Sequence, residues 1–255
     1  MSERLSTLAE GALRFGFTLM EHQLDQFQRY YEMLVDWNSR MNLTAITDYE
    51  AVQVRHFLDS LSVGAVWLNL LATEGENPQA PPVGTSLADI GTGAGFPGVP
   101  LKILWPHIRL TVADSIGKKT SFLTALCKEL GLEEVEVVTA RAEELGQDKR
   151  HRERYDAVTA RAVASLPVLC EYCLPLAKVD GVMLAPKKGD ISLELREAER
   201  ASKLLGGGQP QTHEVTLPGE EESRVVVAIR KEKPTPPGYP RRVGLAKQKP
   251  LGSSA

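Results

Sequence analysis

Cysteine and long apolar runs are scarce in this sequence. Its 255 residues include only Cys127, Cys170 and Cys173, which are too few for a disulfide framework. Cys170 and Cys173 lie in an apolar stretch with no second ligand pair at metal-binding spacing, so we expect both to be buried and no metal to be bound. The longest apolar stretches, around 61–71 and 166–177, are too short and too interrupted to span a bilayer. We therefore expect a cytoplasmic protein without a membrane partner.

Overall charge gives little reason to expect a nucleic-acid partner, because the net charge is −3. The charge is unevenly distributed, however. Residues 230–255 hold one acid against seven basic residues and carry +6, which leaves −9 for the rest of the chain. Such a tail can be a solvated terminus or a phosphate-binding segment, and composition favours neither. The seven basic residues are Arg230, Lys231, Lys233, Arg241, Arg242, Lys247 and Lys249.

The N-terminal part of the chain is predicted to be helical over residues 1–73. Leu24, Phe27 and Tyr31 recur at three- and four-residue spacing, which places them on one helix face. The pattern breaks at 38–42 and resumes at 51–71. Three prolines and two glycines between 74 and 84 predict a linker.

Short apolar runs alternate with helical segments over residues 83–230, which we take as a second domain, followed by a basic tail at 231–255. This alternation predicts an α/β fold with a doubly wound, mostly parallel, seven-stranded sheet and helices on both faces. No helix separates the last two runs, so an antiparallel hairpin should end the sheet. Strands are predicted at 86–90, 110–113, 135–139, 157–159, 181–185, 212–217 and 223–229, and helices at 97–104, 118–130, 166–176 and 191–205.

A glycine-rich turn follows the first predicted strand, with Gly91, Gly93 and Gly95 at alternate positions after Asp89. Glycine lets the backbone turn sharply and lets a ligand approach closely. The overlapping segment 93–98 matches the G-x-G-x-x-G fingerprint of dinucleotide sites, but that fingerprint should begin where the strand ends. Asp89 would repel a pyrophosphate and attract the amino group of a methionine moiety. The loop therefore favours S-adenosylmethionine as the cofactor.

The ends of the next two strands carry further candidates for binding a nucleoside. Asp114 ends the second strand, where a carboxylate can accept both ribose hydroxyls, although it can also serve as a helix N-cap. Ser115 follows it, and Ile116 can lie against an adenine face. Ala142 and Glu143 follow the third strand, where a backbone amide and a polar side chain would lie near the adenine edge.

Taken together, these features resemble the bacterial glucose-inhibited division protein B family over nearly the whole chain. Members of that family use S-adenosylmethionine to methylate N7 of a guanine in 16S (small-subunit) ribosomal RNA. The glycine loop alone indicates only the cofactor class, whereas the combination of motifs is specific. The motifs that carry the resemblance are Trp37-Asn38, Asn42-Leu43-Thr44, His56–Leu61, Asp89–Pro100, Asp114-Ser115, Lys118-Lys119, Phe122-Leu123, Arg141-Ala142-Glu143, Thr159–Ala162, Lys187-Lys188-Gly189, Tyr239–Gly244 and Lys249-Pro250-Leu251.

The resemblance implies a Rossmann-like class I methyltransferase fold. The stretch 74–82 is longer than is usual in the family, which suggests a surface insertion. The resemblance also implies a set of positions that line the cofactor pocket: Gly91, Phe96, Asp114, Ala142, Glu143 and Arg161.

Methylation of guanine N7 needs no general base, because N7 carries a lone pair and no proton. The enzyme must instead place N7 in line with the methyl group. Arg161, after the fourth strand, is the candidate for orienting the base, with an ion pair to a neighbouring acid as the alternative. Lys188 is the second catalytic candidate, with a plain surface lysine as the alternative. His56 and Asp59 are expected to share a buried hydrogen bond that props the pocket wall.

The expected partner is small-subunit ribosomal RNA, or the ribosomal subunit, bound by a monomer. A base must leave its stack to reach the cofactor, so a partly unpaired loop is the expected substrate. A methyltransferase of another substrate, or a non-catalytic RNA-binding or ribosome-assembly factor, remains the alternative. The residues expected to contact RNA are Arg141, Lys188, Arg241, Arg242, Lys247 and Lys249.

Overall fold

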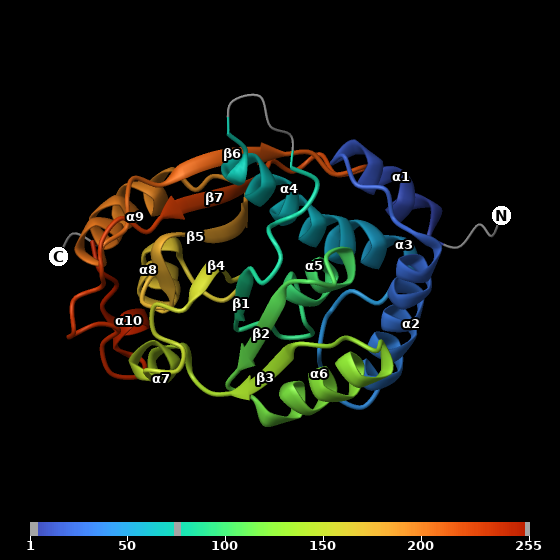
Figure 1. Ribbon diagram of the computed structural model, residues 1–255, viewed down its shortest axis with the longest axis horizontal. Coiled ribbons are helices and arrows are strands. Elements are labelled where there is room, and N and C mark those ends of the chain that lie inside the picture. Colours follow the sequence, from blue (N-terminus) through green and yellow to red (C-terminus); the bar gives the residue numbers. More distant parts are fainter. Residues whose placement is uncertain (1–4, 74–77, 253–255) are drawn as a thin grey trace.

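A seven-stranded sheet runs through the centre of the computed structural model, which describes residues 5–73 and 78–252 (Figure 1). Its strand order is β3-β2-β1-β4-β5-β7-β6. The first five pair in parallel, whereas β7 runs antiparallel between β5 and β6. The predicted doubly wound sheet and its terminal hairpin are therefore confirmed. The strands are β1 (Ser86–Ile90), β2 (Arg109–Asp114), β3 (Val135–Thr139), β4 (Tyr155–Thr159), β5 (Ala177–Lys188), β6 (Gln211–Val215) and β7 (Arg224–Arg230).

Helices cover both faces of the sheet (Figure 1). The predicted helix break after residue 38 is confirmed, and α3, η1 and α4 then run on without interruption. The element η1 is a π-helix, a wider turn that often occurs at functional sites. The helices are α1 (Ser6–Arg14), α2 (Glu21–Asn38), α3 (Tyr49–Val52), η1 (Gln53–Leu58), α4 (Asp59–Leu71), α5 (Gly98–Leu104), α6 (Gly117–Glu129), α7 (Ala142–Gln147), α8 (Leu166–Cys173), α9 (Ser192–Leu204) and α10 (Leu245–Gln248).

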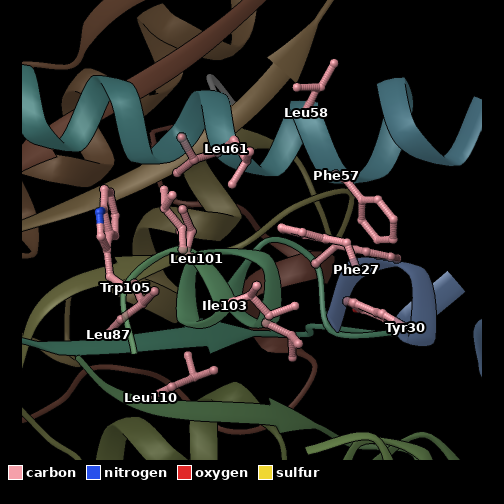
Figure 2. Close-up of a cluster of buried hydrophobic side chains, with 14 of the residues drawn as sticks. Phe27, Tyr30, Phe57, Leu58, Leu61, Leu87, Leu101, Ile103, Trp105 and Leu110 are labelled. Atoms are coloured by element: carbon pink, nitrogen blue, oxygen red, sulfur yellow. The ribbon is translucent and has the colours of Figure 1, made fainter. Parts of the chain in front are cut away.

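The N-terminal helices share a hydrophobic core with one face of the sheet. Figure 2 shows Phe27 of α2 and Phe57 of η1 on one side of α5, and Leu87 of β1 on its other side, below Trp105. The Phe27, Phe57 and Leu87 side chains are fully buried. Burial of a large apolar side chain contributes roughly 1.5–3 kcal/mol, so the N-terminal region and the sheet stabilise each other through this core.

The opposite face of the sheet packs against α8 and α9. Cys170 and Cys173 lie in this second core and are fully buried, as the apolar stretch around them predicts. Burial raises the pKa of Cys170 to about 12, so its thiol stays protonated and unreactive at neutral pH. Within residues 5–73 and 78–252, no helix is both long and apolar enough to cross a membrane.

Two segments without regular strands complete the fold. Residues 78–84 contain no helix or strand, as predicted for a linker, and the rest of the predicted linker and insertion, at 74–77, lies outside the described residues. The C-terminal segment after β7 packs along the body of the molecule. Lys231 is buried and donates to the carbonyl of Leu174 at 2.5 Å, while Arg152 donates to the carbonyls of Thr235 and Tyr239.

Candidate active site

The glycine-rich turn between β1 and α5 has the backbone conformation that its sequence requires. Gly91 and Gly93 have φ of +67° and +62°, a left-handed region that side chains disfavour. A Cβ built on Gly93 would meet no atom within 4 Å, so the space above this residue is open. The turn therefore presents bare backbone at the carboxyl edge of the sheet, where ligands bind in this architecture.

Asp89 of β1 stabilises this turn by hydrogen bonds to two of its residues. Its Oδ2 accepts hydrogen bonds from the Gly98 amide at 2.8 Å and from the Thr92 hydroxyl at 2.6 Å. The side chain is fully buried, and this burial raises the pKa of Asp89 to about 6, although the two hydrogen bonds oppose the shift. Within the described residues its Oδ1 has no hydrogen-bond partner.

A second unsatisfied oxygen lies on the neighbouring strand. Thr159 of β4 stands opposite Asp89 in the parallel register, and its hydroxyl is also buried without a partner in the described part of the chain. Buried polar atoms nearly always have a partner, and exceptions often mark sites where a ligand or water belongs. The ends of β1 and β4 therefore offer two acceptor oxygens for a donor group that the protein itself does not supply.

Asp114 shapes a cleft of about 220 Å³ beside the glycine turn. Its Oδ2 accepts from the Gly93 amide at 3.1 Å and its Oδ1 from the Ile116 amide at 2.9 Å. Helix α6 has Ile116 at its N-cap position and no side-chain cap, so the alternative that Asp114 caps this helix is wrong. The cleft brings together the predicted cofactor residues Gly91, Asp114, Ser115, Ile116, Ala142 and Glu143.

The C-terminal segment reaches this cofactor cleft, which the sequence did not indicate. Glu143 is buried, and its Oε1 accepts from the Gly244 amide at 2.9 Å. Lys247 of α10 lines the cleft together with Arg141. The sequence predicts that both residues contact RNA, and the structure places both at the cofactor cleft. The polar Glu143 that was expected near an adenine edge thus also anchors the tail.

Arg161 lies just beyond β4 and is held by four neighbours. Its NH1 group donates to Asp59 Oδ2 at 2.6 Å and to the Arg55 carbonyl at 3.1 Å, and its NH2 group lies 3.1 Å from His56 Nδ1. The guanidinium also lies 5.1 Å from the centroid of the Phe96 ring. The ion-pair alternative for Arg161 is therefore realised, but the same residue lines a second cleft of about 540 Å³. We refer to this second cleft as the acceptor cleft.

Phe96, the predicted cofactor residue at the end of the turn, forms the floor beneath Arg161. Its ring stacks on His56 at 4.5 Å between centroids and on Tyr30 of α2 at 5.2 Å. The Tyr30 hydroxyl donates to the carbonyl of Ala94 at 2.5 Å. The N-terminal helix α2 thus supports the glycine turn and the aromatic floor together.

His56 is neutral and lies beside Arg161. Its Nδ1 is 3.1 Å from both the Arg161 guanidinium and the Arg55 carbonyl oxygen, and its Nε2 is 2.8 Å from the Thr44 hydroxyl. Burial, with Arg161 as the second cause, lowers the pKa of His56 to about 3. The hydrogen bond expected between His56 and Asp59 is wrong: within the described chain the two are joined only through Arg161.

We expect His56 to remain neutral across the physiological pH range. Its folded pKa lies below its unfolded value of about 6.5, so the folded state binds fewer protons and loses stability as pH falls from about 6.5 toward 3. The imidazole signals in an NMR titration should therefore not shift between pH 5 and pH 8. A midpoint near 6.5 would show that His56 is not held by Arg161.

Lysines 187 and 188 point in different directions from the end of β5. The Lys188 side chain is 61% exposed and pairs with Glu222 at 3.1 Å at the rim of the acceptor cleft. The Lys187 side chain is only 14% exposed and faces the residues that follow β4. Lys187 was missed from sequence, although strand alternation requires that neighbouring side chains point to opposite faces.

The basic residues of the tail do not form one surface. Arg241 makes a bidentate pair with Glu171, whose side chain is fully buried, at 2.6–3.1 Å. The assignment of Arg241 to RNA phosphates is therefore corrected, because its guanidinium neutralises a buried carboxylate. Arg242 and Lys249 are exposed.

A glycine turn after β1, a carboxylate at the end of β2 and a terminal antiparallel hairpin together define the fold as that of class I methyltransferases. The chain belongs to the GidB family, described as rRNA small subunit methyltransferase G, whose sequence profile matches residues 23–223. The resemblance noted from the sequence is thereby confirmed.

Named relatives support this family membership, because the similarity covers most of the length of both chains. The chain is 48% identical to the ribosomal RNA small subunit methyltransferase G of an Exiguobacterium species (strain AT1b), covering 92% of this chain and 94% of that protein. It is 47% identical to the protein of the same name from a Roseiflexus species, covering 97% and 100%. Among solved structures, MtNAS in complex with MTA and tNA matches with a TM-score of 0.50 at 14% identity, covering 90% of this chain and 76% of that one, which supports the fold alone.

Proposed function

We propose that this protein transfers a methyl group from S-adenosylmethionine to N7 of a guanine in small-subunit ribosomal RNA. One observation carries this proposal most directly. The cofactor cleft and the acceptor cleft meet at Ala162, which lines both. A methyl donor bound in one cleft and a base bound in the other would therefore approach each other beside this residue.

The residues of the cofactor cleft fit S-adenosylmethionine. The open backbone at Gly93 admits a ligand. The unsatisfied Asp89 Oδ1 and Thr159 hydroxyl are fully buried near the ends of β1 and β4 and do not line the cleft, but they would accept from an ammonium group such as that of a methionine moiety. Asp114, already fixed at the end of β2, is the group that would accept ribose hydroxyls. Gly91, Phe96, Ser115, Ile116, Ala142 and Glu143 would complete the site.

The chemistry of N7 methylation requires no titratable base. The cofactor supplies a methyl group on a positively charged sulfur, and the N7 lone pair accepts it without losing a proton. His56 has its pKa lowered to about 3 and both ring nitrogens engaged, so it positions Arg161. Arg161 is the group that would bind guanine O6, because its Nε makes no hydrogen bond to any residue that the structure describes.

Contacts to the RNA backbone are assigned to exposed basic residues around the two clefts. Lys188 stands at the rim of the acceptor cleft, and Arg141 and Lys247 line the cofactor cleft. Arg242 and Lys249 extend this set along the C-terminal segment. Together they would hold phosphates on either side of an unstacked base.

Two measurements test the proposal. Calorimetric titration with S-adenosylmethionine should show one binding site, and a labelled methyl group should then appear as 7-methylguanosine after nuclease digestion of small-subunit RNA or particles. Cofactor binding without transfer to either substrate would indicate another acceptor. Absence of cofactor binding would support an RNA-binding or assembly role without catalysis.

Neighbouring arginines in the tail should respond differently to alanine substitution. Arg241→Ala leaves Glu171 buried without a partner and should lower the free energy of unfolding by about 2 kcal/mol. Arg242→Ala removes an exposed charge and should leave stability unchanged while reducing the salt dependence of RNA binding by about one phosphate contact. Denaturant unfolding measures the first effect, and RNA binding at several salt concentrations measures the second. A loss of stability in Arg242→Ala but not in Arg241→Ala would contradict the contacts described here.

A further inference from the structure

The segment from Arg161 to Ser165, which joins β4 to α8, borders both clefts. Ala162 lines both clefts, and Val163 lines the cofactor cleft. Val163 lies so close to Gly91 that a Cβ on that glycine would stand 2.6 Å from Val163 Cγ2. The segment therefore borders the place where a methyl donor and an acceptor base would have to be aligned.

The backbone of this segment is strained at its centre. Ala162 has φ of +57°, a left-handed conformation that costs an alanine roughly 1–2 kcal/mol. A residue keeps such a conformation only where its surroundings hold it there. Contacts that fix the segment on its C-terminal side are therefore needed to keep Ala162 and Val163 in place.

Lys187 and Glu194 supply these contacts. Lys187 Nζ donates to the carbonyl of Ala164 at 2.9 Å and to Glu194 Oε2 at 2.7 Å. The same Glu194 oxygen accepts from the Leu166 amide at 2.7 Å. Ser165, at the N-cap position of α8, makes no side-chain cap, so the carboxylate of α9 satisfies the first turn of α8 instead.

The pair is built differently from the lysine pairs at the surface. The Lys187 side chain is 14% exposed and that of Glu194 is 33% exposed, and both reach the backbone of one segment from different elements. Lys188 next to it is 61% exposed and contacts the Glu222 side chain. Lys187 thus contacts the segment that joins β4 to α8, whereas Lys188 lies at the rim of the acceptor cleft.

We infer that Lys187 and Glu194 are positioning residues for methyl transfer, which hold Ala162 and Val163 at the edge where the cofactor cleft and the acceptor cleft meet. This inference rests on the proposed function. Both residues also line the acceptor cleft, but their hydrogen bonds go to the Ala164 carbonyl and the Leu166 amide, so they set the alignment of the reacting groups more than the affinity for either. A displacement of about 1 Å at a reacting centre can cost on the order of 100-fold in rate.

The test compares Lys187→Met and Glu194→Gln with wild type under saturating cofactor and RNA. We expect kcat for methyl transfer to fall by roughly 10- to 100-fold in Lys187→Met, with the KM for RNA and the Kd for S-adenosylmethionine within about threefold of wild type. Lys187→Arg keeps a donor and should recover most of the rate. Glu194→Gln retains an oxygen that can accept from the Leu166 amide. It is the variant to be measured if Lys187→Met does not fold.

A matched control lies on the same strand. Lys178 pairs with Asp156 near the opposite end of β5, away from both clefts, so Lys178→Met should leave kcat unchanged. If the wild type methylates RNA and both Lys187→Met and Glu194→Gln keep wild-type kcat, the inference is overturned and the proposed function stands. A rate loss that only parallels weaker cofactor binding also overturns it. A wild type that transfers no methyl group overturns the proposed function, and this inference with it.

Discussion

Replacing Arg161 with methionine is expected to lower kcat/KM for methyl transfer by about 1000-fold, the range seen when a preorganised donor is removed from an active site. Arg161 is held by Asp59, His56 and the Phe96 ring before any substrate binds. Its contribution therefore requires no reorganisation when the base arrives. Methyl transfer to small-subunit RNA at subsaturating RNA measures the effect.

The variant should still fold, because the partner of Arg161 keeps a second cation. Asp59 Oδ1 accepts from Arg224 at 2.9 Å, and Arg224 is itself paired with Glu220. Arg161→Lys should not restore activity, since an ammonium cannot reach Asp59, His56 and a base edge together. Arg230→Met, at the distant end of β7, is the matched control. Wild-type transfer by Arg161→Met would remove this residue from the mechanism.

Replacing Asp89 with asparagine is expected to weaken S-adenosylmethionine binding by about 100-fold while leaving the protein at least as stable as wild type at pH 7. The amide oxygen can still accept from Thr92 and Gly98, so the glycine turn keeps its support. The NH2 group of the asparagine would take the place of the unsatisfied Oδ1. Because an NH2 group is a hydrogen-bond donor, it cannot accept a hydrogen bond from an ammonium group. Calorimetry measures the affinity, and thermal unfolding the stability.

The pH dependence of stability distinguishes a specific loss of cofactor binding in Asp89→Asn from a general destabilisation of the fold. The folded pKa of Asp89 is raised to about 6, so the folded state binds the proton more tightly than the unfolded state. The resulting stability is fully present below about pH 4 and is lost as pH rises through 6. Asp89→Asn should lack this loss.

Asp156 provides the opposite case. Burial alone would raise the pKa of Asp156, but the hydrogen bonds from Lys178 and Ser86 together outweigh it and lower this pKa, so the contribution of Asp156 to stability is present at neutral pH and lost in acid. Asp156→Asn should therefore destabilise the protein at pH 7 and leave cofactor affinity unchanged. Equal losses of stability in Asp89→Asn and Asp156→Asn would show that Asp89 is only a structural residue.

Most of the sheet could be predicted from the sequence because its strands are short buried runs bounded by turn residues. The parallel pairing of most strands and the position of the glycine turn follow from that alternation, whereas the strand order comes from the structure alone. β5 is longer than predicted, Ala177–Lys188 in place of 181–185, because it pairs with β4 on one side and with β7 on the other. Pairing partners of this kind are not encoded in a local pattern.

Contacts between distant segments account for the errors at the site. The position between a strand and Gly189 predicts Lys188 as the catalytic candidate, but the chemically identical Lys187 is the one that pairs with Glu194 of α9. The basic tail predicts an RNA contact for Arg241, and its actual partner Glu171 is 70 residues away in the chain. The bridging of His56 and Asp59 by Arg161 likewise depends on residues more than 100 positions apart. The types of residue needed for the chemistry could be read from the sequence, but their partners could not.

The most direct test of guanine N7 as the acceptor uses two RNAs that differ at one atom. One is a small-subunit RNA transcript with guanosine at the modified position, and the other carries 7-deazaguanosine there, which keeps every Watson–Crick group and lacks N7. We predict methyl transfer from labelled S-adenosylmethionine to the first RNA and none to the second, with both bound equally well. Equal transfer to both RNAs would contradict methylation at N7.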